Sequence, residues 1–485
     1  MKYIGTRNKE ITATASEAIL KGICEDGGLF IPDEMPVMDK SLEELVDLDY
    51  RELAYEVMKL FLTDFTEEEL RYCINSAYDE KFDDKGIAPL RVENGVGILE
   101  LFHGRTLAFK DMALSILPYL MKTSAAKNGL DKEIVILTAT SGDTGKAALE
   151  GFANVPGTRI IVFFPEDGVS PVQKLQMVTQ EGDNTCVCGI LGNFDDAQTA
   201  VKTIFTDKEL VRELDEKGFN FSSANSINIG RLVPQIVYYF YAYLAMAKKG
   251  EIRLGDEINF TVPTGNFGNI LAGYIAKKAG LPVKTFICAS NENKVLFDFF
   301  KTGVYDKNRE FVVTTSPSMD ILISSNLERL LCMVSGQEKT RALMESLSKE
   351  GKYTLEVNEN IVGEYATEKE TADAIKSLYE KTGYVLDTHT AVAYAAYEKY
   401  VAESSDVTKN VIVSTASPYK FTKDVLCSID DKYKDGDPLK LMAELEKVSK
   451  VAVPEVIRDI ETRPVLHKNV CERDKIKEFV KGRLL

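Results

Sequence analysis

Lys110 is the residue of this sequence best suited to nucleophilic chemistry. It ends the run His103-Gly104-Arg105-Thr106-Leu107-Ala108-Phe109-Lys110, directly before a helix expected over 112–121. A lysine among apolar residues at a helix start loses hydration, and the helix dipole also disfavours its charge, so its pKa falls and a neutral amine becomes available. The alternative is the commoner fate of a lysine, in which the ammonium reaches solvent and pairs with Asp111.

A glycine-rich loop, Gly265-Asn266-Phe267-Gly268-Asn269, is suited to holding a phosphate group. Its two glycines allow close backbone approach, and the helix expected over 270–279 adds partial positive charge at its N-terminus. The loop contains neither the Gly-Lys-Ser/Thr of a P-loop nor a dinucleotide-binding fingerprint. The alternative is an ordinary tight turn between a strand and a helix.

A second polar loop is Ser141-Gly142-Asp143-Thr144-Gly145. Its hydroxyl and N–H groups suit a carboxylate ligand, and Asp143 could accept a hydrogen bond from a phenol-like hydroxyl or an amine. The alternative is that Ser141 or Asp143 simply caps the helix that follows.

The patch at 223–231 could bind a further anion, because Arg231 follows Asn225 and Ser226 closely. A planar guanidinium can hold an oxyanion through two donors. The alternative is that Asn225 or Ser226 caps the apolar helix expected over 232–247. Taken together, two anion sites, a Schiff-base lysine at 110 and a carboxylate loop fit a pyridoxal-phosphate enzyme that acts on a phosphorylated amino acid.

The elements that must position these residues follow from the hydrophobic pattern. From about residue 98, short β-branched runs alternate with amphipathic segments of helix length, which is typical of βαβ units around a mostly parallel sheet. Strands are expected at 133–137, 159–164, 185–190, 257–262, 283–289 and 410–414. In such sheets ligands bind beyond the carboxyl ends of the strands, so we expect the polar loops, including Ser414-Thr415-Ala416-Ser417-Pro418, to form one pocket.

Composition excludes several other classes of protein. The chain has 485 residues and a formal net charge of −16, which argues against binding nucleic acid or an anionic membrane through bulk charge. No apolar run approaches the ~20 residues of a membrane span, and the first residues lack a secretory core, so we expect a cytoplasmic protein. Eight cysteines without a C-x-x-C pair favour free thiols, and three scattered histidines predict no metal cluster.

At these residues the sequence resembles the threonine synthase family, in the longer form found in bacteria and fungi. The resemblance covers nearly the whole chain and is most specific at 103–111, 139–145, 223–231, 263–269, 317–321 and 387–392. It implies a fold type II (tryptophan-synthase-β-like) pyridoxal-phosphate enzyme, with two open, mostly parallel sheets flanked by helices. The implied domains are a mainly helical N-terminal region at 1–95, a smaller α/β domain at 96–230 with the cofactor lysine and carboxylate loop, and a larger one at 231–485 with the cofactor phosphate loop.

The resemblance also implies roles for single residues. Lys110 would form the Schiff base and Asp143 would lie near the cofactor 3′-hydroxyl, while Thr415 would face the pyridine nitrogen. The cofactor phosphate would be held by Gly265, Asn266, Phe267, Gly268 and Asn269. The substrate would be bound by Ser141 and Thr144 at its carboxylate and by Asn225, Ser226 and Arg231 at its phosphate. Ser417 replaces a frequent histidine and Thr388 replaces a common proline before His389, so Ser417 and His389 receive no role.

The activity implied is threonine synthase activity: O-phospho-L-homoserine and water give L-threonine and phosphate by a pyridoxal-phosphate-dependent β,γ-replacement. We expect a monomer or homodimer with a small-molecule substrate and no nucleic-acid, membrane or metal partner. The alternatives within this cofactor group are a threonine or serine dehydratase and a phospholyase. A non-catalytic relative that binds the cofactor or a metabolite as a sensor is a further alternative, and the intact Lys110 and polar loops argue against it.

Overall fold

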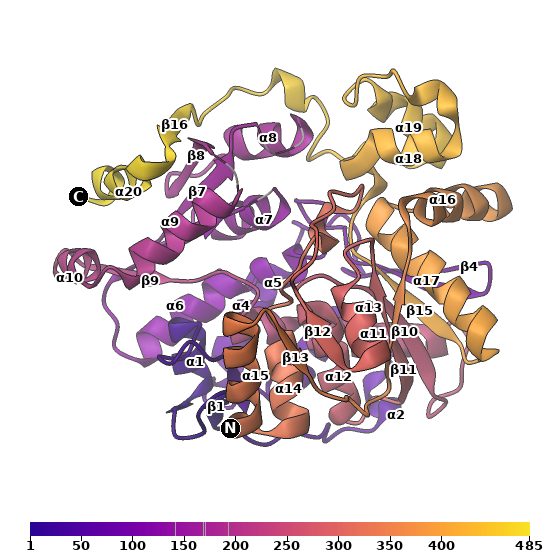
Figure 1. The fold of residues 1–485 in the computed structure, drawn as a ribbon, viewed down its shortest axis with the longest axis horizontal. Helices are drawn as coiled ribbons and strands as arrows, with labels where there is room; N and C mark the ends of the chain where they lie inside the picture. Colours follow the sequence, from indigo (N-terminus) through magenta and orange to yellow (C-terminus); the bar gives the residue numbers. More distant parts are fainter. Residues whose placement is uncertain (141, 168, 170, 193) are drawn as a thin grey trace.

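Two open sheets form the frame of the protein (Figure 1). The computed structural model describes residues 1–140, 142–167, 169, 171–192 and 194–485. The larger sheet has six strands in the spatial order β14 (Ile361–Tyr365), β11 (Val283–Ser290), β10 (Ile258–Pro263), β15 (Asn410–Ser414), β5 (Val96–Glu100) and β4 (Leu90–Glu93). The smaller sheet has five strands in the order β16 (Asn469–Glu472), β8 (Thr185–Leu191), β7 (Thr158–Pro165), β6 (Glu133–Ala139) and β9 (Phe219–Ser222).

Both sheets are mostly parallel, as the alternation of strands and helices predicted. The pairings of the smaller sheet are all parallel, and in the larger sheet β4 alone runs antiparallel to its neighbour, β5. The six strands expected from the β-branched runs all form, with ends at most two residues from the expected ones. This agreement confirms the predicted α/β class.

Helices cover both faces of each sheet, which explains why the strands are apolar at successive positions. On the larger sheet, the side chains of Phe260 and Val262 pack in one cluster with α11 (Ile229–Lys248) and α12 (Gly268–Lys278). Ile287 and Ile412 enter another cluster with α16 (Glu368–Thr382) and α17 (Thr388–Ser404). The smaller sheet lies between α6 (Leu117–Lys127) with α7 (Asp143–Phe152) and α9 (Phe194–Thr206) with α20 (Ile476–Leu484).

The remaining elements are short or peripheral. The other helices are α1 (Ala15–Lys21), α2 (Leu42–Leu45), α3 (Tyr50–Met58), α4 (Glu67–Ala77), α5 (Asp111–Leu114), α8 (Pro171–Val178), α10 (Lys208–Glu216), α13 (Val295–Thr302), α14 (Leu327–Ser335), α15 (Gln337–Lys349), α18 (Thr422–Ile429) and α19 (Leu441–Ser449). The other strands are β1 (Tyr3–Gly5), β2 (Thr12–Ala13), β3 (Phe30–Pro32), β12 (Val304–Asp306) and β13 (Lys352–Thr354). Within the described residues, no helix combines the length and apolar character needed to cross a membrane.

Two helices differ from the sequence expectation near the site. The helix expected over 112–121 is divided into α5 and α6, because Pro118 stands in the first turn of α6 and lacks the N–H that would continue the preceding helix. After the third polar loop, a helix starting at Tyr419 is the expectation from the apolar pattern at 419–427, but the structure has a short 3₁₀ helix, η2 (Pro418–Phe421), before α18.

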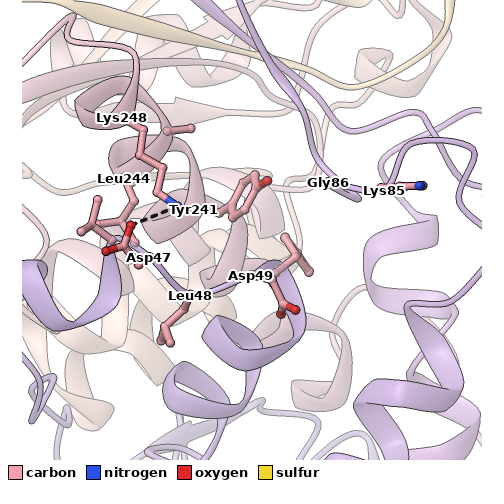
Figure 2. A pocket seen from close by; sticks show the side chains of 11 residues that line it. Asp47, Leu48, Asp49, Lys85, Gly86, Tyr241, Leu244 and Lys248 are labelled. Carbon is pink, nitrogen blue, oxygen red and sulfur yellow. Dashed lines mark ion pairs between the residues drawn. The ribbon is translucent and has the colours of Figure 1, made fainter.

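The N-terminal region is mainly helical, as expected, but it also contains a small antiparallel sheet, β2-β1-β3, that the sequence did not predict. Ser41 and Thr66 cap α2 and α4 through reciprocal capping boxes. A cavity of about 230 Å³ lies between the turn at 46–50 and α11, and Figure 2 shows Asp47 and Lys248 across it, with their charged atoms 3.9 Å apart. This cavity contains none of the predicted site residues.

The two sheets are interleaved along the chain. β4 and β5 precede the whole smaller sheet in sequence but lie at the edge of the larger one. Near the other end, the chain leaves α18 and α19, crosses the molecule and adds β16 to the edge of the smaller sheet beside β8 (Figure 1). The expected division into 1–95, 96–230 and 231–485 therefore differs from the division by sheets at these two places.

All of the predicted polar loops follow the carboxyl ends of parallel strands. The loops after β6 and β9 leave neighbouring strands of the smaller sheet, and those after β10, β15 and β5 leave neighbouring strands of the larger one. Because the carboxyl ends of parallel strands meet at one edge of a sheet, this topology brings each group of loops together.

Candidate active site

Lys110 is held beside the third polar loop by a short antiparallel bridge. The N–H of Phe109 donates to the carbonyl of Thr415 at 2.8 Å, and the N–H of Ser417 donates to the carbonyl of Leu107 at 3.0 Å. The Lys110 side chain is 11% exposed, and its Nζ lies 3.4 Å from Ser318 Oγ and 3.8 Å from Asp143 Oδ2. The amine thus lies beside polar groups from two segments that are distant in the chain, while a third segment holds its backbone.

The alternative in which Lys110 reaches solvent beside Asp111 is wrong. Asp111 is buried and turns back to its own loop, where its carboxylate accepts the N–H of Thr106 at 2.8 Å and the hydroxyl of Thr106 at 2.7 Å. Gly104 leaves room for that carboxylate, since a Cβ there would lie 2.4 Å from Asp111 Oδ2. These hydrogen bonds fix the loop before Lys110. They also occupy the Asp111 carboxylate, which therefore does not pair with Lys110.

The electrostatic surroundings favour the neutral form of Lys110. Burial lowers the pKa of Lys110 to about 8, with Asp143 opposing the change and the charges of Lys420 and Arg231 reinforcing it. The sequence predicted this direction from desolvation. Because Arg231 contributes to the pKa of Lys110, its guanidinium and the amine lie in the same electrostatic environment.

Asp143 begins α7 and faces two lysines. Its Oδ1 accepts a hydrogen bond from Lys420 Nζ at 2.7 Å and from Gln173 Nε2 at 3.0 Å. Burial alone would raise the pKa of Asp143, but Lys420, followed by Lys110, holds that pKa well below its usual range. The carboxylate is therefore ionised at the centre of the site.

The carboxylate loop owes its shape to Thr140. The Thr140 hydroxyl accepts the N–H groups of Gly142 and Gly145, each at 2.9 Å. Asp143 is the first residue of α7 and Gly142 is its N-cap, so capping by Asp143 is wrong; the Thr140 hydroxyl accepts a first-turn amide instead, and Ser141 lies outside the described residues. Thr144 is half-buried in the first turn of α7.

The loop Gly265–Asn269 forms a tight cradle between β10 and α12. A Cβ on Gly265 would lie 2.5 Å from the carbonyl oxygen of Ser318, and Phe267 adopts a positive φ of 61° before α12 begins at Gly268. Asn326 satisfies one carbonyl of the loop. Its N–H and its side-chain amide donate to the carbonyl oxygen of Asn266 at 3.0 and 2.9 Å. The first-turn amides of α12 have no intrahelical acceptor and remain for a ligand.

Arg231 is a buried cation without an acidic partner among the described residues. It is 3% exposed, one of its terminal nitrogens donates to the carbonyl of Ala224 at 2.9 Å, and its Nε has no partner there. Burial lowers the pKa of Arg231 to about 10. A desolvated guanidinium with free donors is the chemistry of an oxyanion site.

The two other residues of that patch do not cap α11, so that alternative is wrong. Asn228 is the N-cap, and its Oδ1 accepts the N–H of Gly230 at 2.8 Å. Asn225 is exposed, and Ser226 is half-buried with its hydroxyl 3.4 Å from Asn326 Nδ2. Asn326 therefore contacts both the patch and the glycine-rich loop.

Comparisons with known proteins agree with this geometry. Three family descriptions match: "Threonine synthase N terminus" over residues 2–78, "Pyridoxal-phosphate dependent enzyme" over 96–417 and "Threonine synthase, C-terminal" over 390–480. The threonine synthase of Schizosaccharomyces pombe is 38% identical over 464 residues, which cover 88% of each chain. The chain belongs to the threonine synthase family.

Solved structures of this family superpose closely on the fold. The pyridoxal-phosphate-bound threonine synthase from Brucella melitensis has a TM-score of 0.86 and 35% identity over 99% of both chains. The threonine synthase from yeast has a TM-score of 0.88 and 33% identity over 100% of this chain and 98% of that one. The chain is accordingly a fold type II, pyridoxal-phosphate-dependent enzyme.

The described residues fit this cofactor. The cradle at Gly265 and the free first-turn amides of α12 suit its phosphate, and the buried Asn269 Nδ2 has no partner among the described residues. The hydroxyls of Tyr238 and Tyr239 each donate to Asn269 Oδ1 at 2.7 Å, which fixes that side chain. Lys110 would supply an amine for its aldehyde. Thr415 is buried beside the Lys110 loop, and its position toward the ring nitrogen stays a prediction.

His389 receives a function that the sequence left open. Its Nε2 accepts the N–H of Ser318 at 3.1 Å, so the ring proton is on Nδ1, which lies 3.3 Å from Asp387 Oδ1. His389 thus holds the residue whose hydroxyl contacts Lys110 and whose carbonyl limits Gly265. Ser417, the other unassigned residue, accepts the N–H of Tyr419 at 3.3 Å and caps η2.

Three residues of the site were missed by the sequence analysis. They are Lys420, Asn326 and Arg329. Arg329 is fully buried and donates to the Asn326 side chain and to the carbonyl of Ile227, so it joins the two anion-binding segments. The available signals were weak: a lysine between Tyr419 and Phe421, and an arginine three residues after an asparagine.

Proposed function

We propose that this chain is a threonine synthase that converts O-phospho-L-homoserine and water into L-threonine and phosphate. The observation that carries the substrate assignment is Arg231, a buried guanidinium without a carboxylate partner in the described structure, whose charge acts on Lys110. The cofactor phosphate has its own cradle at Gly265–Asn269, so Arg231 is left for a second phosphate group. A dehydratase acting on free threonine or serine has no use for that site.

The predicted residue roles divide the substrate into two ends. Arg231, with Asn225 and Ser226, would bind the phosphate, and Thr144 with the amides at the start of α7 would bind the carboxylate. Ser141 keeps its predicted place at that carboxylate. Binding both ends fixes the carbon chain between them, so proximity contributes much of the rate.

Lys110 would carry the proton transfers. Gly265–Asn269 would hold the phosphate of pyridoxal phosphate, and Lys110 would hold its aldehyde until the substrate amine takes that place. The bound cofactor would supply an electron sink that stabilises negative charge at the substrate Cα. The free amine of Lys110 removes the proton from Cα and then one from Cβ, and phosphate leaves from Cγ with the bonding electrons. Water adds a hydroxyl group at Cβ, and protons return to Cγ, which completes the methyl group of threonine, and to Cα. The remaining proton of the water leaves with the phosphate.

Arg231 acts at the leaving group. Negative charge grows on the phosphate oxygen as the Cγ–O bond breaks, and a desolvated guanidinium stabilises that charge more than water does. Lys110 must be unprotonated to accept a proton. Since its pKa is about 8, the reactive form increases as the pH rises through that value.

The assembly, compartment and domain limits belong to this proposal as well. We infer a cytoplasmic monomer or homodimer whose domains follow the expected division, amended so that β5 belongs with the larger sheet and β16 with the smaller one. Sedimentation at several protein concentrations measures the oligomeric state.

A side-by-side assay tests the proposed function. We expect O-phospho-L-homoserine to yield equal amounts of threonine and phosphate, while threonine and serine yield no keto acid. Lys110→Ala should abolish product formation and the absorbance of the bound cofactor together. Keto acid from threonine or serine would identify a dehydratase, and phosphate release without threonine would identify a phospholyase; either result would overturn the proposal.

A further inference from the structure

Lys420 is a buried lysine that the proposed reaction does not use. It lies in η2, directly after the third polar loop, and its side chain is 2% exposed. Its Nζ lies 2.7 Å from Asp143 Oδ1 and donates to the carbonyl of Thr106 at 2.9 Å. It therefore connects η2 with the loop before Lys110 and with the start of α7.

Asp143 is shared unequally by two lysines. Lys420 is within hydrogen-bond distance of Oδ1, whereas Lys110 Nζ is 3.8 Å from Oδ2. Gln173 also donates to Oδ1, at 3.0 Å. Attraction between opposite charges in a desolvated site is strongest at the shortest separation. The carboxylate is thus neutralised first by Lys420.

We propose that Lys420 is a positioning residue that engages Asp143, so that Lys110 keeps a neutral, nucleophilic amine. When both lysines are protonated, the buried cluster of Lys110, Lys420 and Asp143 has a net positive charge. Loss of the proton from Lys110 removes that excess charge. Without Lys420, the Asp143 carboxylate would be available to the Lys110 ammonium and would stabilise it as an ion pair. This inference rests on the proposed function in one respect, the role of Lys110 as the cofactor lysine.

The charges around the site agree with this arrangement. Burial is the main cause of the lowered pKa of Lys110, Asp143 opposes it, and Lys420 is the largest of the neighbouring positive charges that lower it further. Lys420 also precedes Lys110 among the charges that lower the pKa of Asp143. The second observation agrees with the distances of 2.7 Å from Lys420 and 3.8 Å from Lys110, which make Lys420 the main partner of Asp143.

The experiment measures the protonation of Lys110 directly. The full-length chain, freed of pyridoxal phosphate, is treated with acetic anhydride over a range of pH, and acetylation of Lys110 is followed by peptide mass spectrometry. The wild type should show a midpoint near pH 8. Lys420→Met should raise that midpoint by about one pH unit or more, which slows labelling at neutral pH at least ~10-fold.

Asp143→Asn should shift the labelling midpoint of Lys110 in the opposite direction to Lys420→Met. Removing the carboxylate leaves Lys110 beside a positive charge alone, so its midpoint should fall below the wild-type value. The double variant, with Asp143→Asn and Lys420→Met, should return to a low midpoint because neither charge remains and burial persists. A purely structural role for Lys420 would move the midpoints of both single variants in the same direction.

Lys146→Met is the matched control. Lys146 is another buried lysine, on α7, but it pairs with Glu150 at 3.0 Å. Its loss should leave the midpoint unchanged. In the cofactor-loaded enzyme, the pH dependence of the bound-cofactor absorbance should change for Lys420→Met and stay constant for Lys146→Met.

An unchanged or lowered midpoint in Lys420→Met would overturn the inference. If that variant does not fold, an Asp143→Asn midpoint at or above the wild-type value would overturn it equally, and a lowered one supports it. Failure of the proposed function is distinguishable, because the labelling midpoints do not depend on which substrate the loaded enzyme converts.

Discussion

The glycine-rich loop and the Arg231 patch are both proposed to bind phosphate, but they are built from different groups. The loop Gly265–Asn269 contains no charged side chain and offers backbone amides and a helix N-terminus. The patch is centred on one buried guanidinium. Asn326 and Arg329 connect the two, so the difference in chemistry is maintained over a short distance.

This difference matches the different fates of the two phosphate groups. A cradle of amides is fully formed before its ligand arrives and suits a group that stays bound through many turnovers. A buried charge without a counter-ion is costly, by several kcal/mol, until an anion enters. In the proposed reaction, Arg231 would therefore favour binding of the substrate phosphate and stabilise the leaving group as negative charge develops.

Of the substitutions that test this comparison, replacement of Arg231 in the patch should have the largest effect. Arg231→Leu should lower kcat/KM for O-phospho-L-homoserine by ~10²–10³, about 2.7–4 kcal/mol of transition-state stabilisation, because the leaving phosphate loses its cation. Inhibition by inorganic phosphate should disappear with it. Steady-state kinetics and cofactor absorbance measure these effects, and the absorbance should not change.

Arg212→Leu on α10 is the control for that substitution, because its side chain is 75% exposed. It should leave kcat/KM unchanged. Loss of bound cofactor in Arg231→Leu, with normal turnover after cofactor is added, would show that the two anion sites are not separate.

A glycine substitution tests the proposed role of the glycine-rich loop. Gly265→Ala should weaken pyridoxal-phosphate binding by ~10–100-fold, because the new Cβ would meet the Ser318 carbonyl oxygen at 2.5 Å and the backbone must move. Equilibrium titration of the cofactor-free chain measures this. Phosphate inhibition at saturating cofactor should persist.

Gly268→Ala is the matched control within the same loop. Its nearest contact would be Asn326 Nδ2 at 3.4 Å, an ordinary distance, so its cofactor affinity should change much less. Equal losses in both alanine variants would contradict a cradle whose tight wall is at Gly265.

His389 gives the smallest expected effect. His389→Leu removes the acceptor of the Ser318 N–H, which should cost about 1–3 kcal/mol of stability and weaken cofactor binding only a few-fold. His389→Gln can present a carbonyl oxygen near the position of Nε2 and should recover most of both. Urea unfolding and cofactor titration check the pair; a glutamine variant no better than leucine would argue against the hydrogen bond as the cause.

The amino-acid sequence predicted the architecture and the loops that form the candidate site. Runs of β-branched residues are long enough to define all six expected strands, and polar loops at their ends predicted where ligands bind. Desolvation at a helix start predicted the direction of the Lys110 pKa. These properties depend on neighbours in the chain, and local sequence therefore reports them.

Tertiary structure alone decided which groups meet. Lys420 is 314 residues from Thr106 and Arg329 is 102 residues from Ile227, and no periodicity in the sequence predicts either contact. The same holds for β16, whose partner strand is far away in the chain, and for the choice of Asn228 over Asn225 or Ser226 as the cap of α11. Hydrogen bonds and charges act over a few ångströms in space, so their partners are fixed only when packing brings distant segments together.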